Sequence, residues 1–371
     1  MPDVIVVGAG VIGLACSWRL AQGGQRVLLL EAKRPGAGAS GAALGSLIPA
    51  SVLRDGPVPA LQRESLARFE AFCREVEAVS GRATEFNRCG RLEIFGSPGR
   101  AVEARREVER APSRLSWAPS PVQSVITPDA IAAVAPGVVA PHGGLWCAAT
   151  AQVEPRSLLA ALHEACVRAG VEVECGAPVD GLLIEHDRVI GVRQGDRRRV
   201  SRHVLAAAGA CQPAFDERLA RAAPVTPAKG VALLLRVRPL RCRAVVRSRS
   251  IYVMPRDASH VAVGATTEHQ SHFEAEADEL SIRQLRDGAT EFWPLLRDSE
   301  LVEAWVGLRP SSRSLCPYLG AVPGLPGLWV AMGHYKMGIT LAPITAESLA
   351  HEIIHGTPLR DLSAFAPLSP G

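Results

Sequence analysis

A glycine-rich turn between two apolar stretches near the start of the chain constrains the fold more than any other feature. The glycines of this turn stand in G-x-G-x-x-G spacing at Gly8, Gly10 and Gly13. The pattern predicts a strand at 3–7, a helix over roughly 11–22 and a second strand at 27–30. Such a strand–helix–strand unit is typical of an α/β protein with a parallel sheet.

Each glycine has a physical reason if the turn holds a dinucleotide. Gly8 allows the tight turn, Gly10 lets a pyrophosphate approach the backbone, and Gly13 lets helix and strand pack closely. The helix N-terminus offers free N–H groups and partial positive charge to phosphates. Glu31, at the end of the second strand, is placed to accept hydrogen bonds from a ribose. An acid there disfavours NADP but does not separate FAD from NAD, and a parallel unit without a ligand is the alternative.

Composition excludes several other classes of protein. The chain has 371 residues, of which 47% are apolar and 21% charged, and a net charge of +4. Its basic residues are scattered, which argues against nucleic-acid binding. Nine cysteines without a C-x-x-C pair suggest reduced thiols, and we found neither a signal peptide nor an apolar run of membrane-spanning length. We therefore expect a cytoplasmic protein of two domains.

The segment RPGAGASGAALGSLIPA (34–50) is dense in small residues, where an NAD dehydrogenase would place another helix and strand. Such a loop suits close backbone approach to a bulky planar ligand. Three further stretches are GGLWCAATAQVEPRSLLAAL (143–162), WVGLRPSSRSLCPYLG (305–320) and LWVAMGHYKMGITLAPITAESLA (328–350). On these motifs, over nearly its whole length, the sequence resembles the D-amino-acid-oxidase superfamily of flavoproteins. The resemblance is closest to the glycine oxidase branch, which is often tied to thiamine biosynthesis.

The resemblance implies an α/β fold with a Rossmann-type FAD-binding domain and a second, mainly antiparallel-sheet substrate domain. The FAD-binding domain would be discontinuous, built from 1–84, 143–215 and 305–371, with 85–142 and 216–304 forming the substrate domain. FAD would be bound non-covalently. The residues that the resemblance and the glycine motif place at FAD are Gly8, Gly10, Gly13, Glu31, Ser40, Gly45, Ser46, Val179, Gly209, Gly333, Tyr335, Lys336, Met337 and Gly338.

Arg309 follows an apolar run that predicts a strand, and Pro310 directly after it predicts the end of that strand. A guanidinium there can clamp a carboxylate through two parallel hydrogen bonds. The resemblance implies this role toward an amino-acid substrate; a structural salt bridge is the alternative. It also places the Tyr252 hydroxyl at the substrate pocket, and a core aromatic with a satisfied hydroxyl is the alternative.

The stretch GHYKMGITLAP (333–343) predicts a turn that opens the C-terminal helix. The resemblance implies that this turn runs beside the flavin ring, with His334 and Tyr335 near it and with His334 as a candidate catalytic residue alongside Arg309 and Tyr252. N–H groups there can stabilise the negative charge of a reduced flavin. Lys336 and Met337 stand where the family usually has arginine and asparagine. Ser46 stands where methionine is frequent, so the departures affect side-chain contacts and the preference for glycine.

The implied activity is oxidative deamination of glycine or a similarly small amino acid or amine. Hydride would pass from Cα to flavin N5, the imine would hydrolyse, and oxygen would be reduced to hydrogen peroxide. Two alternatives remain: a dehydrogenase that passes electrons to a quinone or partner protein, as in cyanide-forming glycine dehydrogenases, and a non-catalytic flavin-binding subunit. The sequence leaves a homo-oligomer open.

One motif points elsewhere and is rejected. HEIIH (351–355) matches the H-E-x-x-H pattern of zinc proteases. Gly356 predicts that the helix ends directly after the second histidine, and Asp361 is the sole carboxylate side chain among the 16 residues that remain. We therefore expect no metal site.

Overall fold

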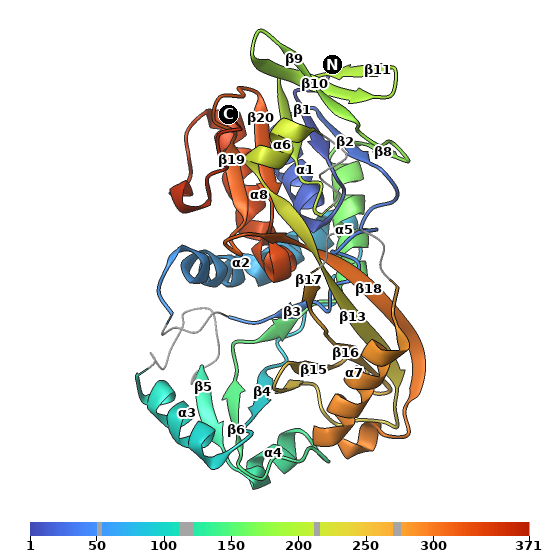
Figure 1. Cartoon of the computed structure of the whole chain (residues 1–371), viewed down its shortest axis with the longest axis vertical. Helices are drawn as coiled ribbons and strands as arrows, with labels where there is room; N and C mark the ends of the chain where they lie inside the picture. The colour runs from blue at the N-terminus through green and yellow to red at the C-terminus, as the bar shows by residue number, and fades with distance from the viewer. Residues whose placement is uncertain (50–53, 111–121, 211–215, 270–275, 371) are drawn as a thin grey trace.

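A mostly parallel six-stranded sheet forms one body of the molecule, as the N-terminal pattern predicts (Figure 1). The computed structural model describes residues 1–49, 54–110, 122–210, 216–269 and 276–370. In spatial order the strands are β19 (Tyr318–Ala321), β20 (Leu328–Met332), β12 (His203–Ala206), β1 (Val4–Val7), β2 (Val27–Glu31) and β8 (Glu172–Cys175). Only the β19–β20 pair is antiparallel.

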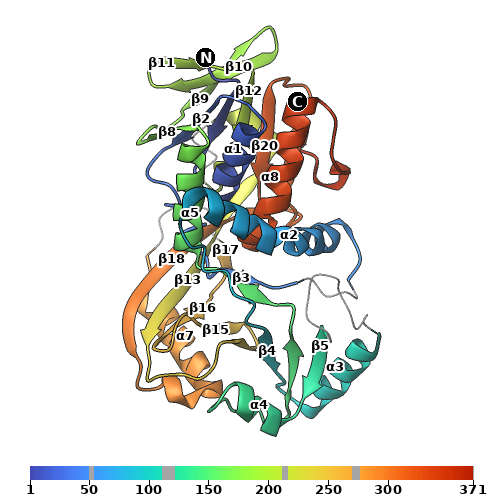
Figure 2. The same cartoon turned by 180° about the vertical axis from the view of Figure 1, so that it is seen from behind.

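Side chains of β1 alternate between two cores, one on each face of this sheet. Val4 and Val6 enter the first core, and Ile5 and Val7 enter the second. Four helices contribute to the first core and pack together on that side (Figure 2): α1 (Val11–Gln22), α2 (Pro57–Ser80), α5 (Pro155–Arg168) and α8 (Gly338–His355). The fold class predicted from the sequence is confirmed.

A smaller sheet and a short helix cover the second core. The smaller sheet contains β9 (Gly181–Glu185), β10 (Arg188–Gln194) and β11 (Arg197–Val200), and the helix is α6 (Glu217–Ala222). Val189 and Val192 of β10 are fully buried against the strands, as is Leu219 of α6. β9 and β10 pair as an antiparallel hairpin.

A nine-stranded, mainly antiparallel sheet forms the second body of the molecule (Figure 1). Its strands are β4 (Arg91–Ile94), β5 (Gln123–Ile126), β6 (Gly144–Cys147), β13 (Val225–Arg236), β14 (Val245–Ser248), β15 (Ile251–Pro255), β16 (His260–Gly264), β17 (Glu268–His269) and β18 (Glu300–Ser312). The associated helices are α3 (Pro98–Arg110), α4 (Pro128–Val134), α7 (Glu279–Phe292) and η2 (Pro294–Leu296). The remaining short elements are β3 (Ser46–Leu47), β7 (Ala151–Gln152), η3 (Tyr335–Met337) and η4 (Ser363–Phe365). None of the helices in the described ranges is long and apolar enough to cross a membrane.

The strand that carries Arg309 is longer than the sequence predicts. β18 continues through Arg309 and Pro310 to Ser312, and Pro310 lies opposite Pro227 of β13. Neither proline has an N–H to donate, so the two can face each other where an antiparallel ladder makes no bond. Among the described strands β18 pairs with β13 alone, apart from a single bridge between Ser311 and His334, and proline is tolerated on such an edge strand. Arg309 therefore lies within the strand and not at its end.

Strand pairing divides the chain between the two sheets. The divisions fall near the predicted domain boundaries but not at them. β6 pairs with β4 and β5, and β18 pairs with β13 along its whole length. Both strands therefore belong to the nine-stranded sheet, although the sequence assigned 143–215 and 305–371 to the other domain. Hydrophobic alternation cannot tell which of two sheets a strand joins, because both sheets bury apolar side chains.

We expect Phe69→Ala to destabilise the protein strongly. Phe69 is 1% exposed on α2, with its ring 6.1 Å from those of Phe72 and Phe86. Loss of a buried phenylalanine costs about 3–5 kcal/mol. Arg74→Ala, on the exposed side of the same helix, removes only a surface ion pair worth about 0–1 kcal/mol. Thermal unfolding should show a clearly lower midpoint for the first variant alone, and equal midpoints would contradict this packing.

Candidate active site

The glycines of the first turn are required because backbone packs against backbone there. Gly8 has φ +102°, and a Cβ on it would lie 2.6 Å from the carbonyl oxygen of Ala207, just after β12. A Cβ on Gly13 would lie 1.8 Å from the carbonyl oxygen of Gly8. α1 starts at Val11, and its N-cap residue Gly10 has no side chain that could cap the helix. The turn therefore presents a helix N-terminus at close range, which fits a pyrophosphate.

Two predicted cofactor residues hold this turn in place. The Glu31 carboxylate accepts hydrogen bonds from the Ala9 N–H at 2.8 Å and the Lys33 N–H at 2.9 Å. Ser40 Oγ accepts one from the Val11 N–H at 3.0 Å. A carboxylate oxygen accepts more than one bond, so Glu31 retains capacity for a ribose hydroxyl.

The other predicted adenosine contacts lie around the same strand ends. The Ala177 N–H donates to the Glu31 carbonyl at 2.9 Å, which brings the segment containing Val179 beside the end of β2. Gly209 follows β12 with φ +61°, and a Cβ there would meet none of the described residues within 4 Å. Open space beside Gly209 and a cradle that only glycine permits are what a dinucleotide needs.

The small-residue loop after β2 is fastened to the nine-stranded sheet. Trp305 Nε1 donates to the Ala42 carbonyl at 2.9 Å, and Arg256 Nη2 donates to the Leu44 carbonyl at 2.7 Å. Gly45 has φ +76°, and a Cβ on it would lie 2.0 Å from the Val153 carbonyl oxygen. Ser46 then pairs with Gln152 in the short β3–β7 ladder. These contacts fix the loop between the two bodies.

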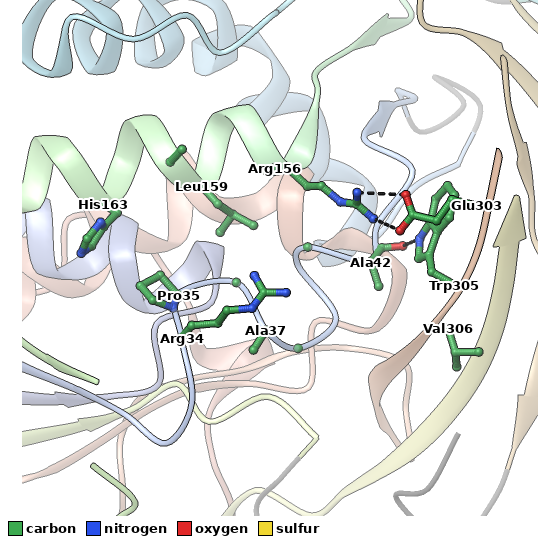
Figure 3. A pocket seen from close by; sticks show the side chains of 14 residues that line it. Arg34, Pro35, Ala37, Ala42, Arg156, Leu159, His163, Glu303, Trp305 and Val306 are labelled. Carbon is green, nitrogen blue, oxygen red and sulfur yellow. Dashed lines mark hydrogen bonds and ion pairs between the residues drawn. The ribbon is translucent and has the colours of Figure 1, made fainter. Parts of the chain in front are cut away.

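A cavity of about 690 Å³ lies on the outer side of this loop, between α5 and β18 (Figure 3). Arg156 closes one end of it, donating to both carboxylate oxygens of Glu303 at 3.1 and 2.6 Å. None of the predicted site residues lines this cavity. It marks the junction of the two bodies, and we assign it no ligand.

The face of the nine-stranded sheet that meets the loop carries Arg309. Its guanidinium lies over Gly230, where a Cβ would be 2.2 Å from Nη2 and 2.3 Å from Nη1. Nη1 donates to the carbonyls of Lys229 at 3.3 Å and Thr266 at 3.1 Å. Burial lowers the pKa of Arg309 below its ordinary value, although arginine remains charged. Among the described residues, no carboxylate lies within ion-pair distance of it.

Tyr252 lies on the same face of the sheet. It pairs with Gly264 on one side and Arg247 on the other, and directly paired residues point to the same face. The Arg247 guanidinium lies 5.1 Å from the centre of the Tyr252 ring, which is a cation–π distance. Tyr252, Leu44 and Trp305 all pack against the buried cluster of Val245, Met254 and Ala262, so Tyr252 lies near the junction.

The predicted flavin turn forms just before α8. Gly333 has φ +74°, and Tyr335 has φ +51°, an uncommon conformation for a residue with a side chain. The Tyr335 ring stacks 6.3 Å from that of His269. Lys336 Nζ donates to Thr267 Oγ1 at 3.1 Å, next to the residue that binds Arg309. α8 begins at Gly338, directly after the N-cap residue Met337, so the helix N-terminus lies at this turn.

His334 lies deeper than its neighbours. It is 3% exposed, and its Nε2 is 3.2 Å from Thr345 Oγ1 on α8. Burial lowers the pKa of the imidazole to about 3, so the ring is neutral at physiological pH. This placement suits a residue that fixes the turn and does not suit one that exchanges protons with a substrate.

Comparison with known proteins identifies the family. A family model described as FAD dependent oxidoreductase matches residues 3–352. The chain belongs to this family. Glycine oxidase of Pseudomonas aeruginosa is 33% identical over 373 residues, which cover 98% of each chain. The bifunctional protein ThiO/ThiG of Nostoc sp. is 32% identical over 358 residues, 95% of this chain but 52% of that longer protein.

Solved structures agree as well. The crystal structure of glycine oxidase from Geobacillus kaustophilus superposes with a TM-score of 0.89, at 25% identity and 98% coverage of both chains. The family resemblance inferred from the sequence is therefore confirmed, and the protein is an FAD-dependent oxidoreductase. Three features of this chain fit FAD: the glycine cradle, the Glu31 carboxylate and the open space beside Gly209.

Sequence reasoning missed three contributors to the site. Gly230 makes room for Arg309, Thr266 supplies a carbonyl to it, and Arg247 stacks on Tyr252. The sequence offered a signal for Arg247, because this arginine interrupts an apolar stretch just before the strand that carries Tyr252. Gly230 and Thr266 offered none, since their roles depend on the path of a side chain from another strand.

Gly13→Ala should abolish tight FAD binding, because the added methyl group collides with the Gly8 carbonyl and opens the cradle. Gly96→Ala, in the body of the nine-stranded sheet, is the matched control, since a Cβ there meets no described residue within 4 Å. We expect at least a tenfold weaker FAD affinity for the first variant and an unchanged affinity for the second. Titration of the FAD-stripped proteins, with circular dichroism as the folding check, measures this. Retained affinity in Gly13→Ala would refute the cradle.

His334 should make the protein sensitive to acid. The unfolded chain binds a proton at this residue below pH about 6.5, whereas the folded chain does so only near pH 3. Acidification between these values therefore favours unfolding, by up to about 1.4 kcal/mol per pH unit. His334→Gln should show a shallower fall of the unfolding midpoint between pH 6.5 and pH 4.5 than the unmodified protein. Parallel curves would show that His334 is not the titrating group.

Proposed function

We propose that this protein oxidatively deaminates glycine or a similarly small amino acid or amine. The substrate, oxygen and water would yield the oxo acid, ammonia or the free amine, and hydrogen peroxide. FAD supplies the acceptor for the hydrogen and electrons removed at the α carbon. The proposal rests above all on Arg309, a guanidinium oriented by two carbonyls with no carboxylate partner among the described residues.

Arg309 is suited to bind the substrate carboxylate. Nη1 is engaged by carbonyl oxygens, which fixes the plane of the guanidinium, and the structure records no hydrogen bond from Nη2 within the described chain. A partly buried arginine held in one plane can donate two parallel bonds to a carboxylate. The carboxylate is the natural handle for positioning the α carbon of a small amino acid.

Tyr252 and the α8 N-terminus would complete the site. Tyr252 is on the same sheet face as Arg309, and its paired residue Gly264 lies against Leu44 of the loop that fits the flavin. The α8 N-terminus supplies positive charge where the reduced cofactor would carry negative charge. No general base is assigned, because an amine with a free lone pair can lose hydride without one.

Arg309→Met should reduce kcat/KM for glycine by about 10²–10³-fold, because removing one partner of a desolvated charge pair costs about 3–4 kcal/mol. Gly230→Ala should also weaken turnover, since its methyl group would displace the guanidinium. Arg313→Met, an exposed arginine four residues further on, is the control. Peroxide release and FAD content would be measured for all three.

Two results would contradict the proposal. Equal turnover by Arg309→Met and Arg313→Met would show that Arg309 does not bind the substrate. Peroxide-free turnover that depends on an added quinone would favour the dehydrogenase alternative.

A further inference from the structure

We infer that the preferred substrate carries a second carboxylate, bound by Arg247 and Lys336, in addition to the one held by Arg309. This inference rests on the proposed function and deepens it. A small amino dicarboxylate, with the second acid on the nitrogen or on the α carbon, is the substrate class that this arrangement fits.

The site has more positive charge than its own carboxylates offset. Lys336 has a neutral hydroxyl, Thr267 Oγ1, as its hydrogen-bond partner. Burial lowers the pKa of Lys336, and the nearby charges of Arg309 and Arg247 lower it further. Lys336 and Arg309 bind the adjacent residues Thr267 and Thr266, so these two cations lie close together, and the Arg247 charge acts on the same lysine. A ligand with one carboxylate satisfies only one of these three cations.

Arg247 is only weakly neutralised. Its Nη1 lies 3.9 Å from the Glu93 carboxylate, beyond hydrogen-bond distance. Glu93 also lies 3.6 Å from Arg91, which is nearly buried, so one acid serves two arginines. Arg247 Nε donates to the Arg249 carbonyl at 2.9 Å, which fixes the direction of the side chain. Its terminal nitrogens remain available to an anion.

Strand register places Arg247 and Arg309 on one surface. Trp305, Ala232, Gly264, Tyr252 and Arg247 are directly paired across five neighbouring strands. Directly paired residues share a face, and the Arg309 side chain crosses the same face. A Cβ on Gly264 would lie 2.3 Å from Leu44, so this face is the one that meets the small-residue loop.

The charge excess persists even after the cofactor is considered. The four cations Arg91, Arg247, Arg309 and Lys336 are accompanied by the single carboxylate Glu93 among the described residues that contact them. An anionic reduced cofactor and one substrate carboxylate would offset two charges and leave one. Unpaired cations in a partly buried site favour a ligand that supplies the missing anion.

Matched substrate pairs test the inference in the holoenzyme. Sarcosine and iminodiacetate differ by one carboxylate on the N-substituent, and D-alanine and D-aspartate differ by one on the side chain. We expect kcat/KM for at least one dicarboxylate to exceed that of its partner by tenfold or more. Malonate should also bind at least tenfold more tightly than acetate. The change in flavin absorbance on titration with each anion measures this binding without turnover.

Variants then assign the preference to residues. Arg247→Gln and Lys336→Gln should each lower the dicarboxylate-to-monocarboxylate ratio by at least fivefold, and Arg247→Lys should retain part of it. Arg243→Gln removes the same charge from an exposed position and should leave the ratio unchanged. FAD content and the unfolding midpoint identify any variant that fails to fold.

The outcomes separate this inference from the function beneath it. Turnover of sarcosine or D-alanine with no advantage for either dicarboxylate would overturn the inference and leave the proposed function intact. Equal ratios in Arg247→Gln and Arg243→Gln would overturn the role of Arg247. No oxidation of any of these compounds would overturn both.

Discussion

The Arg309 guanidinium, partly buried over the backbone of Gly230, is the constraint on which the site depends. A charge removed from water is costly unless polar groups or an opposite charge surround it. Here two carbonyl oxygens orient the charge, and no carboxylate in the described part of the chain neutralises it. An arginine held in this way is preorganised for an anionic ligand, because its geometry is set before the ligand arrives.

The two bodies of the molecule meet through small residues. Gly230 leaves room for the guanidinium, Gly264 for Leu44, and Gly307 for Ala42, all on one face of the nine-stranded sheet. Trp305 and Arg256 then hold the same loop by its carbonyls. The loop that fits the flavin and the face that carries Arg309 are therefore parts of one interface, so the proposed cofactor and substrate sites would be positioned by the same contacts.

Local sequence patterns predicted what depends on neighbours along the chain. The strand–turn–helix around Gly8 and Gly13 follows from apolar alternation and glycine spacing, and α1 and β2 occupy the predicted ranges. Long-range pairing could not be predicted in this way. β18 runs past Pro310 because an opposing Pro227 removes the need for a bond there, and these two prolines are far apart in the sequence. His334 was placed at the flavin from its motif, but only the packing of α8 reveals that its ring points to Thr345.

Mixing the oxidised holoenzyme with small amino acids in the absence of oxygen tests the central claim most directly. If the face around Arg309 holds an amino acid against the flavin, then glycine, sarcosine or an amino dicarboxylate will bleach the visible flavin bands in a single turnover. A flavin spectrum that no amino acid or amine of this size changes would contradict the account. The FAD-binding fold would stand, but Arg309 would need a different partner.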